Sequence, residues 1–284
     1  MAARAPGADM VLEAGGARIP ALGFGTWELS GALCRRMVEV ALEVGYRHID
    51  TAQMYGNERE VGEAVRASGL ERGEVFVTTK IWPDRFRRDA LLRAAEESVA
   101  RLGLGPVDLL LLHWPNPAVP LPETIAALNE ARTFGLARHI GVSNFPTSLL
   151  EEALARSQSP LIANQVEYHP FLSQKRLLAF CRARRIALVA YCPLARGRVF
   201  GHPLLRRIAA RHGKDEGQVA LRWLVQQQGV AAIPRSSRED HIRRNFAIWD
   251  FALSEEEMRA ISALGDPRGR IVDIDGLAPA WDPE

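Results

Sequence analysis

The sequence lacks the features of a membrane protein, a secreted protein or a nucleic-acid-binding arm. No apolar run approaches the ~18 residues that a bilayer-spanning helix needs, and residues 1–20 hold no continuous apolar segment of a signal peptide. The net charge is only +2, and no long block carries charge of one sign. We therefore expect a cytoplasmic protein that binds neither membranes nor nucleic acids, and we expect it to be a monomer.

Cysteine is scarce, and histidine shows no ligand spacing. Cys34, Cys181 and Cys192 are odd in number, far apart and in apolar settings. We expect them to be core residues in a reducing compartment, with a disulfide as the minor alternative. The seven histidines show no H-x-x-x-H or comparable pattern, so we expect no metal site.

Lysine is also rare. Of 36 basic residues only three are lysine, which leaves 33 arginines. Lys80 lies in the apolar run VFVTTKIW, residues 75–82. A cation in a buried strand costs free energy unless it is paired, so Lys80 is either half of a structural ion pair or part of a working site. Two other apolar segments end in reactive groups: RHID at Asp50, with Tyr55 five residues later, and VDLLLLHW at His113.

Short apolar strands alternate with amphipathic helices along most of the chain. We expect strands at residues 19–26, 47–51, 75–82, 107–114, 137–144, 161–168, 186–194 and 230–236. The intervening helices are expected to begin near Ser30, Asn57, Arg88, Leu121, Pro146, Ser173 and Gly217 and after Arg238. This alternation predicts parallel strands with helical crossovers. Eight such units in 284 residues are typical of a (β/α)₈ TIM barrel forming a single domain over residues 1–284.

The remaining segments extend this α/β barrel. Residues 1–17 are expected to cap the bottom of the barrel, 202–213 and 254–264 to form two extra helices, and the tail after Gly265 to form loops. The alternative fold is an open, doubly wound dinucleotide-binding sheet, which requires G-x-G-x-x-G after its first strand. Here that place reads GFGTWE, with Glu28 at the third glycine position, so we favour the barrel.

In a barrel of this kind, Asp50, Lys80 and His113 fall at the ends of neighbouring strands, with Tyr55 in the adjacent loop. The carboxyl ends of the strands form the face that carries enzyme sites. A lysine ammonium ~4 Å from a tyrosine hydroxyl stabilises the phenolate by ~4 kcal/mol, which would lower the tyrosine pKa by about three units. Asp50 can keep Lys80 charged, and His113 can orient a substrate oxygen. The four residues predict a general acid directed at a carbonyl oxygen.

Each residue alone also has a structural explanation. Asp50 and Lys80 could form only a buried ion pair, Tyr55 could be a surface residue, and His113 could be a hydrogen-bonded core histidine. Their occurrence at adjacent strand ends favours a catalytic site. Trp27, Trp82 and Trp114 fall at the same strand ends, and we expect them to wall an apolar substrate pocket.

Several long motifs resemble those of the aldo-keto reductases, especially the short-loop bacterial members called 2,5-diketo-gluconate reductases. The stretch GYRHIDTAQMYGNEREVG, residues 45–62, resembles the first family signature, and VTTKIW and LLHWP resemble its lysine and histidine segments. GVSNF, NQVEYHP and IPRSSREDHIRRN match further segments. The resemblance covers residues 10–282. It implies a TIM-barrel oxidoreductase that transfers hydride from NADPH to aldehydes, ketones or small dicarbonyls.

The resemblance also implies a set of cofactor-binding residues. Ser143, Asn144 and Gln165 would hydrogen-bond the nicotinamide carboxamide, Tyr191 would stack on the ring, and Leu194 would lie along the pyrophosphate. Arg235, Ser236, Ser237 and Arg238 would hold the 2′-phosphate, and Asn245 would contact adenine. His241 stands where many members have an arginine, and an ordinary histidine is mostly neutral at pH 7. Strict preference for NADPH is therefore in doubt, and use of NADH is also expected.

Two other functions are compatible with parts of this pattern. A noncatalytic sensor that binds NADPH would not need the four catalytic residues. A Schiff-base lyase acting through Lys80 would need a neutral lysine, whereas Asp50 favours the charged form. We therefore expect an NAD(P)H-dependent carbonyl reductase with Asp50, Tyr55, Lys80 and His113 as its catalytic residues.

Overall fold

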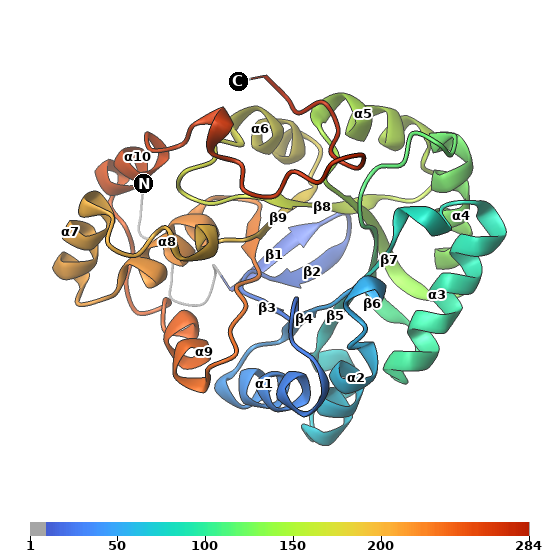
Figure 1. Ribbon diagram of the computed structural model, residues 1–284, viewed down its shortest axis with the longest axis horizontal. Helices are drawn as coiled ribbons and strands as arrows, with labels where there is room; N and C mark the ends of the chain where they lie inside the picture. The colour runs from blue at the N-terminus through green and yellow to red at the C-terminus, as the bar shows by residue number, and fades with distance from the viewer. Residues whose placement is uncertain (1–9, 284) are drawn as a thin grey trace.

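The computed structural model describes residues 10–283 and contains a barrel of eight parallel strands surrounded by helices (Figure 1). In sheet order, which follows the chain, the barrel strands are β3 (Phe24–Gly25), β4 (His48–Asp50), β5 (Phe76–Ile81), β6 (Val107–Leu112), β7 (Ala137–Ser143), β8 (Leu161–Glu167), β9 (Ala187–Tyr191) and β10 (Val230–Ala232). The first and last strands close the ring, because the Gly23 amide donates to the Ala232 carbonyl at 2.8 Å and the Ala232 amide donates to Ala21 at 2.8 Å. The predicted TIM barrel is confirmed, and the open sheet is excluded.

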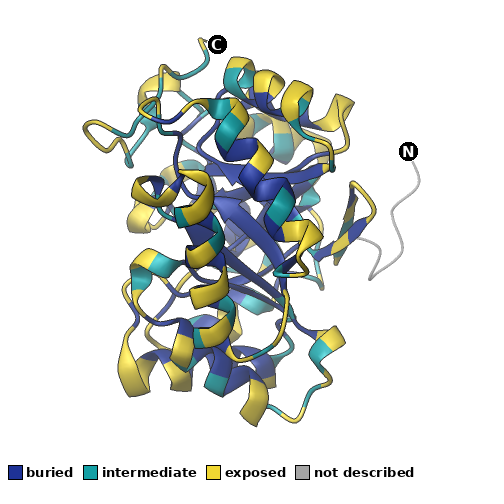
Figure 2. Cartoon of the chain, turned by 90° about the vertical axis from the view of Figure 1, so that its right-hand side faces the viewer, coloured by how far each residue is buried: buried dark blue, intermediate teal, exposed yellow. Residues whose placement is uncertain are grey.

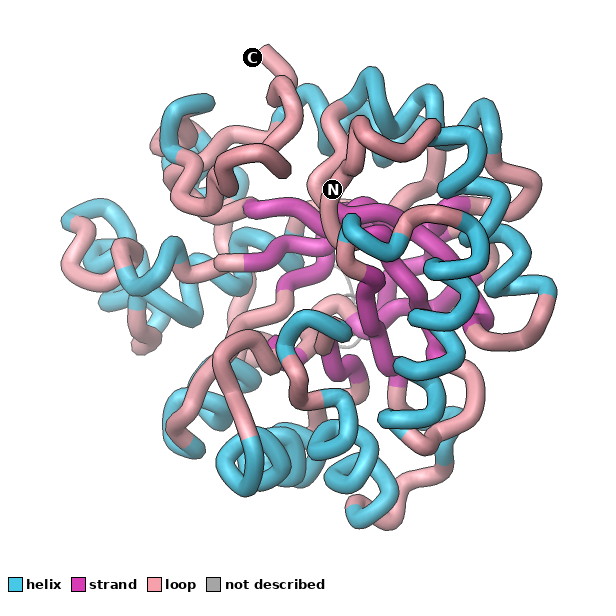
Figure 3. Tube along the Cα trace, turned by 45° about the vertical axis from the view of Figure 1, so that its right-hand side comes forward, coloured by secondary structure: helices cyan, strands magenta, loops and turns pink. Residues whose placement is uncertain are grey.

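The strands lie in the middle of the molecule with helices around them (Figure 3). All six residues of β6, VDLLLL, are buried, as expected for a parallel strand covered on both faces. Alternate residues point inward and outward along each strand. Leu109, Leu111 and Val189 belong to an apolar cluster separate from the main core, which we identify as the filling of the barrel interior. Their neighbours Leu110, Leu112 and Leu188 pack in the main core with residues of the helices.

The outer helices begin within two residues of the predicted positions. They are α1 (Gly31–Val44), α2 (Glu58–Ala67), α3 (Arg88–Leu102), α4 (Leu121–Thr133), α5 (Thr147–Arg156), α6 (Lys175–Ala183), α8 (Glu216–Gln226) and α9 (Glu239–Phe246). Most of them bury one side and expose the other, as the alternating colours along the helices show (Figure 2). The exception is α8, in which residues 217–225 are all buried and none is exposed. The two extra helices are present as α7 (Pro203–His212) and α10 (Glu255–Ser262).

The prediction of one strand over residues 19–26 is wrong. The sequence VLEAGGARIP folds instead into a hairpin of β1 (Val11–Ala14) and β2 (Ala17–Pro20), and the barrel strand starts only at Phe24. Gly15 and Gly16 have φ of 52° and 87°, which two-residue hairpin turns require and glycine supplies without strain. Ala14, Ala17 and Ile19 pack against the interior cluster of the barrel, so the hairpin closes one end. It is the expected N-terminal cap, although residues 1–9 of that prediction lie outside the described part of the chain.

The tail after α10 is loop, as predicted, apart from a short 3₁₀ turn at Pro267–Gly269. It returns across the barrel beside β8 (Figure 1). Gly269 passes so close to the backbone that an added Cβ would lie 1.8 Å from the Phe171 carbonyl oxygen. In residues 10–283, no helix combines the length and the apolar character needed to cross a bilayer.

Candidate active site

Three neighbouring strands bring the predicted catalytic residues together. Asp50 is the last residue of β4, Lys80 is the fifth residue of β5, and His113 follows directly after β6. Tyr55 lies in a short 3₁₀ turn, Gln53–Tyr55, just beyond β4. The register aligns Asp50 with Thr78 and Lys80 with Leu111, so the side chains meet at one end of the barrel.

Lys80 is fully buried and lies at the centre of this group. Its Nζ donates to Asp50 Oδ1 at 2.5 Å, to the Thr51 carbonyl oxygen at 2.9 Å and to the Tyr55 hydroxyl at 3.3 Å. Burial lowers the pKa of Lys80, and the Asp50 carboxylate opposes that change. Lysine therefore has three partners for its three donors, which fixes the direction of the ammonium group.

The expected lowering of the Tyr55 pKa is wrong for the protein without ligand. Burial raises the pKa of Tyr55 well above its ordinary value, and the Asp50 charge raises it further. Desolvation of the phenolate thus outweighs the attraction to Lys80, whose charge is already shared with Asp50. The hydroxyl is therefore held in its protonated form, the state that a proton donor requires.

The His113 imidazole is neutral and has an unpaired nitrogen. Burial, followed by the Lys80 charge, lowers its pKa well below the ordinary value. Its Nδ1 is buried without a hydrogen-bond partner. The ring packs edge-on against Tyr55 at 5.7 Å and against Trp82 at 5.1 Å between centroids. These contacts orient the imidazole at the edge of the cavity that His113 lines.

A cavity of about 710 Å³ opens beside Tyr55 and His113. Trp27 and Trp114 line it, and the Trp27 ring lies 4.8 Å from that of Tyr55. Trp82 is not among the lining residues, so its contribution to the pocket wall is indirect, through its contact with His113. A volume of this size suits a cofactor-sized or drug-sized ligand.

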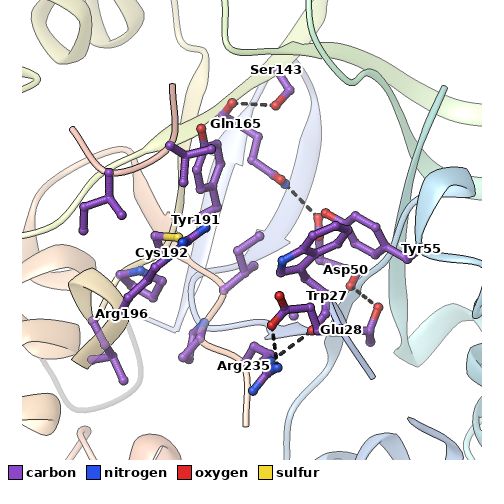
Figure 4. A pocket seen from close by; sticks show the side chains of 18 of the residues that line it. Trp27, Glu28, Asp50, Tyr55, Ser143, Gln165, Tyr191, Cys192, Arg196 and Arg235 are labelled. Atoms are coloured by element: carbon purple, nitrogen blue, oxygen red, sulfur yellow. Dashed lines mark hydrogen bonds and ion pairs between the residues drawn. The ribbon is translucent and has the colours of Figure 1, made fainter. Parts of the chain in front are cut away.

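The residues predicted to bind nicotinamide form a hydrogen-bonded network along one wall, part of which Figure 4 shows (Figure 4). Gln165 Nε2 donates to Asp50 Oδ2 at 2.7 Å, and Ser143 Oγ donates to the Gln165 carbonyl oxygen at 2.8 Å. The Tyr191 hydroxyl donates to Asn144 Oδ1 at 2.8 Å. Each of these residues, and also Leu194, lines the cavity. The network joins the Tyr191 ring and the Asp50–Lys80 pair into one preorganised surface.

The predicted phosphate-binding residues form a separate group on the loop after β10 and on α9. Only Arg235 lines the cavity, and there its guanidinium donates to Glu28 Oε2 at 2.8 Å. Arg238 makes two bonds to Asp240, each of 3.0 Å. His241 Nε2 lies 3.8 Å from the same carboxylate. Ser236, Ser237 and Asn245 lie on the same segment.

Asp240 is the residue of this group that the sequence reasoning missed. Arg238 and, more weakly, His241 and Arg244 lower its pKa to about 2. It therefore carries a full negative charge among the side chains predicted to bind a phosphate. The sequence signal that could have identified Asp240 is its position two residues after Arg238, close enough for the two side chains to pair.

Further residues of the cavity wall were also missed. Cys192 was predicted to be a core residue, but it is partly exposed and lines the cavity. Glu28, Cys192 and Arg196, together with the predicted Asn144, line the cavity with φ between 50° and 63°. Such φ values are uncommon for residues other than glycine and concentrate at functional sites. The tail segment 271–274 forms another part of the wall.

Among residues 10–283, no group of three or more histidine, cysteine, aspartate or glutamate side chains is placed to hold a metal ion. The Asp50 carboxylate instead pairs with Lys80 and Gln165, and the Glu28 carboxylate pairs with Arg235.

Comparison with known proteins gives a consistent result. The profile described as the aldo/keto reductase family matches residues 21–266. The methylglyoxal reductase DkgB of Salmonella typhimurium is 41% identical over 267 residues, covering 93% of this chain and 99% of that protein. A crystal structure provisionally assigned as a 2,5-diketo-D-gluconic acid reductase B is 51% identical, with a TM-score of 0.94 and coverage of 97% and 99%. A Bombyx mori aldo-keto reductase in complex with NADP is 34% identical, with a TM-score of 0.85 and 96% coverage of both chains.

Proposed function

This chain belongs to the aldo/keto reductase family and is an oxidoreductase of that family. From that premise we propose that it reduces small aldehydes, ketones or dicarbonyls with NAD(P)H, with Tyr55 as the general acid. The observation that carries the proposal is the contact of Lys80 Nζ with both Asp50 and the Tyr55 hydroxyl, beside a cavity that Tyr55 itself lines. The name of the Salmonella relative suggests methylglyoxal, a small neutral dicarbonyl, as a type of substrate.

The cavity residues fit a nicotinamide cofactor. The wall offers the Tyr191 ring as a flat platform, held by Asn144. The Gln165 side chain donates to Asp50 Oδ2 through Nε2, and its oxygen would accept a hydrogen bond from the nicotinamide amide. Ser143, Asn144, Gln165, Tyr191 and Leu194 would hold the nicotinamide and pyrophosphate end. When bound, the reduced nicotinamide supplies the hydride.

The protein's own contribution is a proton and a fixed orientation. Tyr55, kept protonated by burial, donates its proton to the carbonyl oxygen as negative charge develops there. Lys80 then stabilises the phenolate that remains, because its ammonium lies 3.3 Å from that oxygen. The neutral His113 ring donates a hydrogen bond to the same carbonyl oxygen. Asp50 keeps Lys80 charged and, through Gln165, ties it to the cofactor wall.

The phosphate end of the site favours NADPH only weakly. Arg235, Arg238, Ser236 and Ser237 would bind the 2′-phosphate, and Asn245 would contact adenine. Arg235 and Arg238 already pair with Glu28 and Asp240, so a phosphate must compete with two carboxylates. His241 adds a positive charge only when it is protonated. We therefore expect NADPH to be used with limited discrimination against NADH.

The alternatives find less support in the geometry. A Schiff-base lyase needs a lysine that can reach a carbonyl, but Lys80 is fully buried and does not line the cavity. A noncatalytic sensor would bind the cofactor without needing the contact between Tyr55 and Lys80. That the chain forms a single domain and is a monomer stays a prediction.

The direct test follows NADPH and NADH absorbance with methylglyoxal and with neutral aromatic aldehydes. We expect both cofactors to be consumed, NADPH at lower KM. Tight NADPH binding without consumption for any aldehyde, ketone or dicarbonyl of the panel would instead indicate the sensor.

A further inference from the structure

The charged groups on the cavity wall are unequally distributed. Among the described residues, the charged side chains that line the cavity are Glu28, Asp50, Arg196, Arg235 and Asp273. Asp50 is paired with the buried Lys80. Glu28 is paired with Arg235, with 2.8 Å between Oε2 and the guanidinium. Arg196 and Asp273 are the two charged lining residues that form no ion pair with another residue of the wall.

Arg196 lies at the end where we place the cofactor. It sits in the short turn Ala195–Gly197 directly after Leu194, which the proposed function assigns to the pyrophosphate. In the close view, Arg196 and Tyr55 are on opposite sides of the pocket (Figure 4). Arg196 would pair with a phosphate of the bound cofactor. It would therefore not attract a negatively charged substrate near Tyr55.

Asp273 lies on the part of the cavity wall that the tail segment 271–274 forms. Its Oδ1 accepts a hydrogen bond of 2.9 Å from Trp281 Nε1. The Trp281 ring in turn packs 6.2 Å from Trp114, the residue next to His113. This chain of contacts connects Asp273 to the wall that holds the proposed catalytic histidine.

The segment that carries Asp273 is fixed by a buried carboxylate. Glu167, at the end of β8, is fully buried, and its two oxygens accept the amides of Ile271 and Val272 at 2.7 and 2.8 Å. Arg270 packs 3.5 Å above the Trp281 ring and 3.9 Å from Glu167. The Arg270 charge also interacts with Asp273, so this arginine faces the two carboxylates of Glu167 and Asp273. Arg270 does not line the cavity.

We propose that Asp273 is a specificity-determining residue that disfavours carbonyl substrates carrying a carboxylate. The inference rests on the proposed function. It assigns this enzyme to neutral or cationic aldehydes and dicarbonyls, with sugar acids and keto acids as poor substrates. Exposed charges interact weakly across water, so removal of the Asp273 charge should change the relative rates about two- to fivefold.

The experiment uses a pair of aldehydes that differ in charge, 4-carboxybenzaldehyde and its methyl ester, methyl 4-formylbenzoate. The measured quantity is the ratio of kcat/KM for the acid to kcat/KM for the ester, with saturating NADPH. The intrinsic difference in reactivity between the aldehydes cancels when this ratio is compared between protein variants. The variants are Asp273→Asn and Asp273→Lys, with Asp275→Asn as the matched control, because Asp275 is an exposed acid two residues away that does not line the cavity.

We expect Asp273→Asn to raise the ratio about two- to fivefold and Asp273→Lys to raise it further. Asp275→Asn should leave it unchanged. In ~1 M salt the Debye length is ~3 Å. The acid-to-ester ratios of the native protein and of Asp273→Asn should therefore differ less there than at low salt. A ratio that is equal in the native protein and both Asp273 variants overturns the proposal, as does a native preference for the acid over the ester. Failure to reduce even the ester would count against the proposed function itself.

Discussion

Replacing Lys80 by methionine should destabilise the protein strongly, because it leaves a buried carboxylate without its cation. Lys80 and Asp50 have side-chain exposures of 0% and 2%, so solvent cannot take over the role of the ammonium. Methionine has a similar length and fills the space, which limits any cavity effect. Asp50 would keep only its bond to Gln165 at Oδ2.

The expected magnitude follows from the burial of the pair. Removing one partner of a buried ion pair typically costs ~3–5 kcal/mol. At ~2–4 °C of melting temperature per kcal/mol for a chain of this size, the midpoint should fall by about 6–20 °C. The double variant with Asp50→Asn and Lys80→Met removes both charges, and the asparagine can still bond Gln165. It should therefore regain at least half of the lost free energy of unfolding, although neither variant should reduce aldehydes.

Urea unfolding followed by tryptophan fluorescence measures these differences, with the two single variants and the double variant completing a cycle. We expect a coupling free energy of at least ~2 kcal/mol between the two positions. Equal stability of the Lys80→Met variant and the double variant, within ~0.5 kcal/mol, would refute the argument. It would show that Asp50 finds another partner in the absence of Lys80.

Three further predictions concern single residues. Tyr55→Phe should bind NADPH with nearly native affinity, measured by fluorescence quenching, but lose ~10²–10⁴-fold in kcat; a variant that keeps half its kcat would remove Tyr55 from the proton transfer. His113 stays neutral in the folded protein while the unfolded chain takes up its proton below about pH 6.5, so stability should fall as the pH drops through that value. His113→Asn should reduce this slope by up to ~1.4 kcal/mol per pH unit, and urea midpoints between pH 5 and 7 that shift in parallel for both proteins would contradict it. His241→Arg should tighten NADPH about ten- to hundredfold and leave NADH nearly unchanged. Affinity ratios indifferent to this substitution would show that His241 does not contact the 2′-phosphate.

Much of the barrel could be predicted from the sequence because its information is local. The run VDLLLLHW predicts a buried parallel strand, and the structure confirms it as β6 at Val107–Leu112. Strand order follows chain order in this topology. The ends of β4, β5 and β6 must therefore be neighbours, and the juxtaposition of Asp50, Lys80 and His113 follows from their positions along the chain.

The first strand shows where local information fails. Residues 19–26 are mostly apolar and predict one strand, but the chain divides them between the hairpin and β3. The division depends on Ile19 packing into the end of a barrel built from residues more than 80 positions away, such as Leu109 and Leu111. Apolar character alone does not distinguish these two burial sites.

By itself, then, the sequence determined the fold, the family resemblance and the identities of the residues gathered around Tyr55. Tertiary structure alone decided their electrostatic state. Burial reversed the expected shift in the Tyr55 pKa, Asp240 and Glu28 took the arginines predicted to bind a phosphate, and a tail anchored on Glu167 brought Asp273 to the cavity. Charges and loops interact through space, so their effects depend on distances and solvent exclusion that no spacing along the chain encodes.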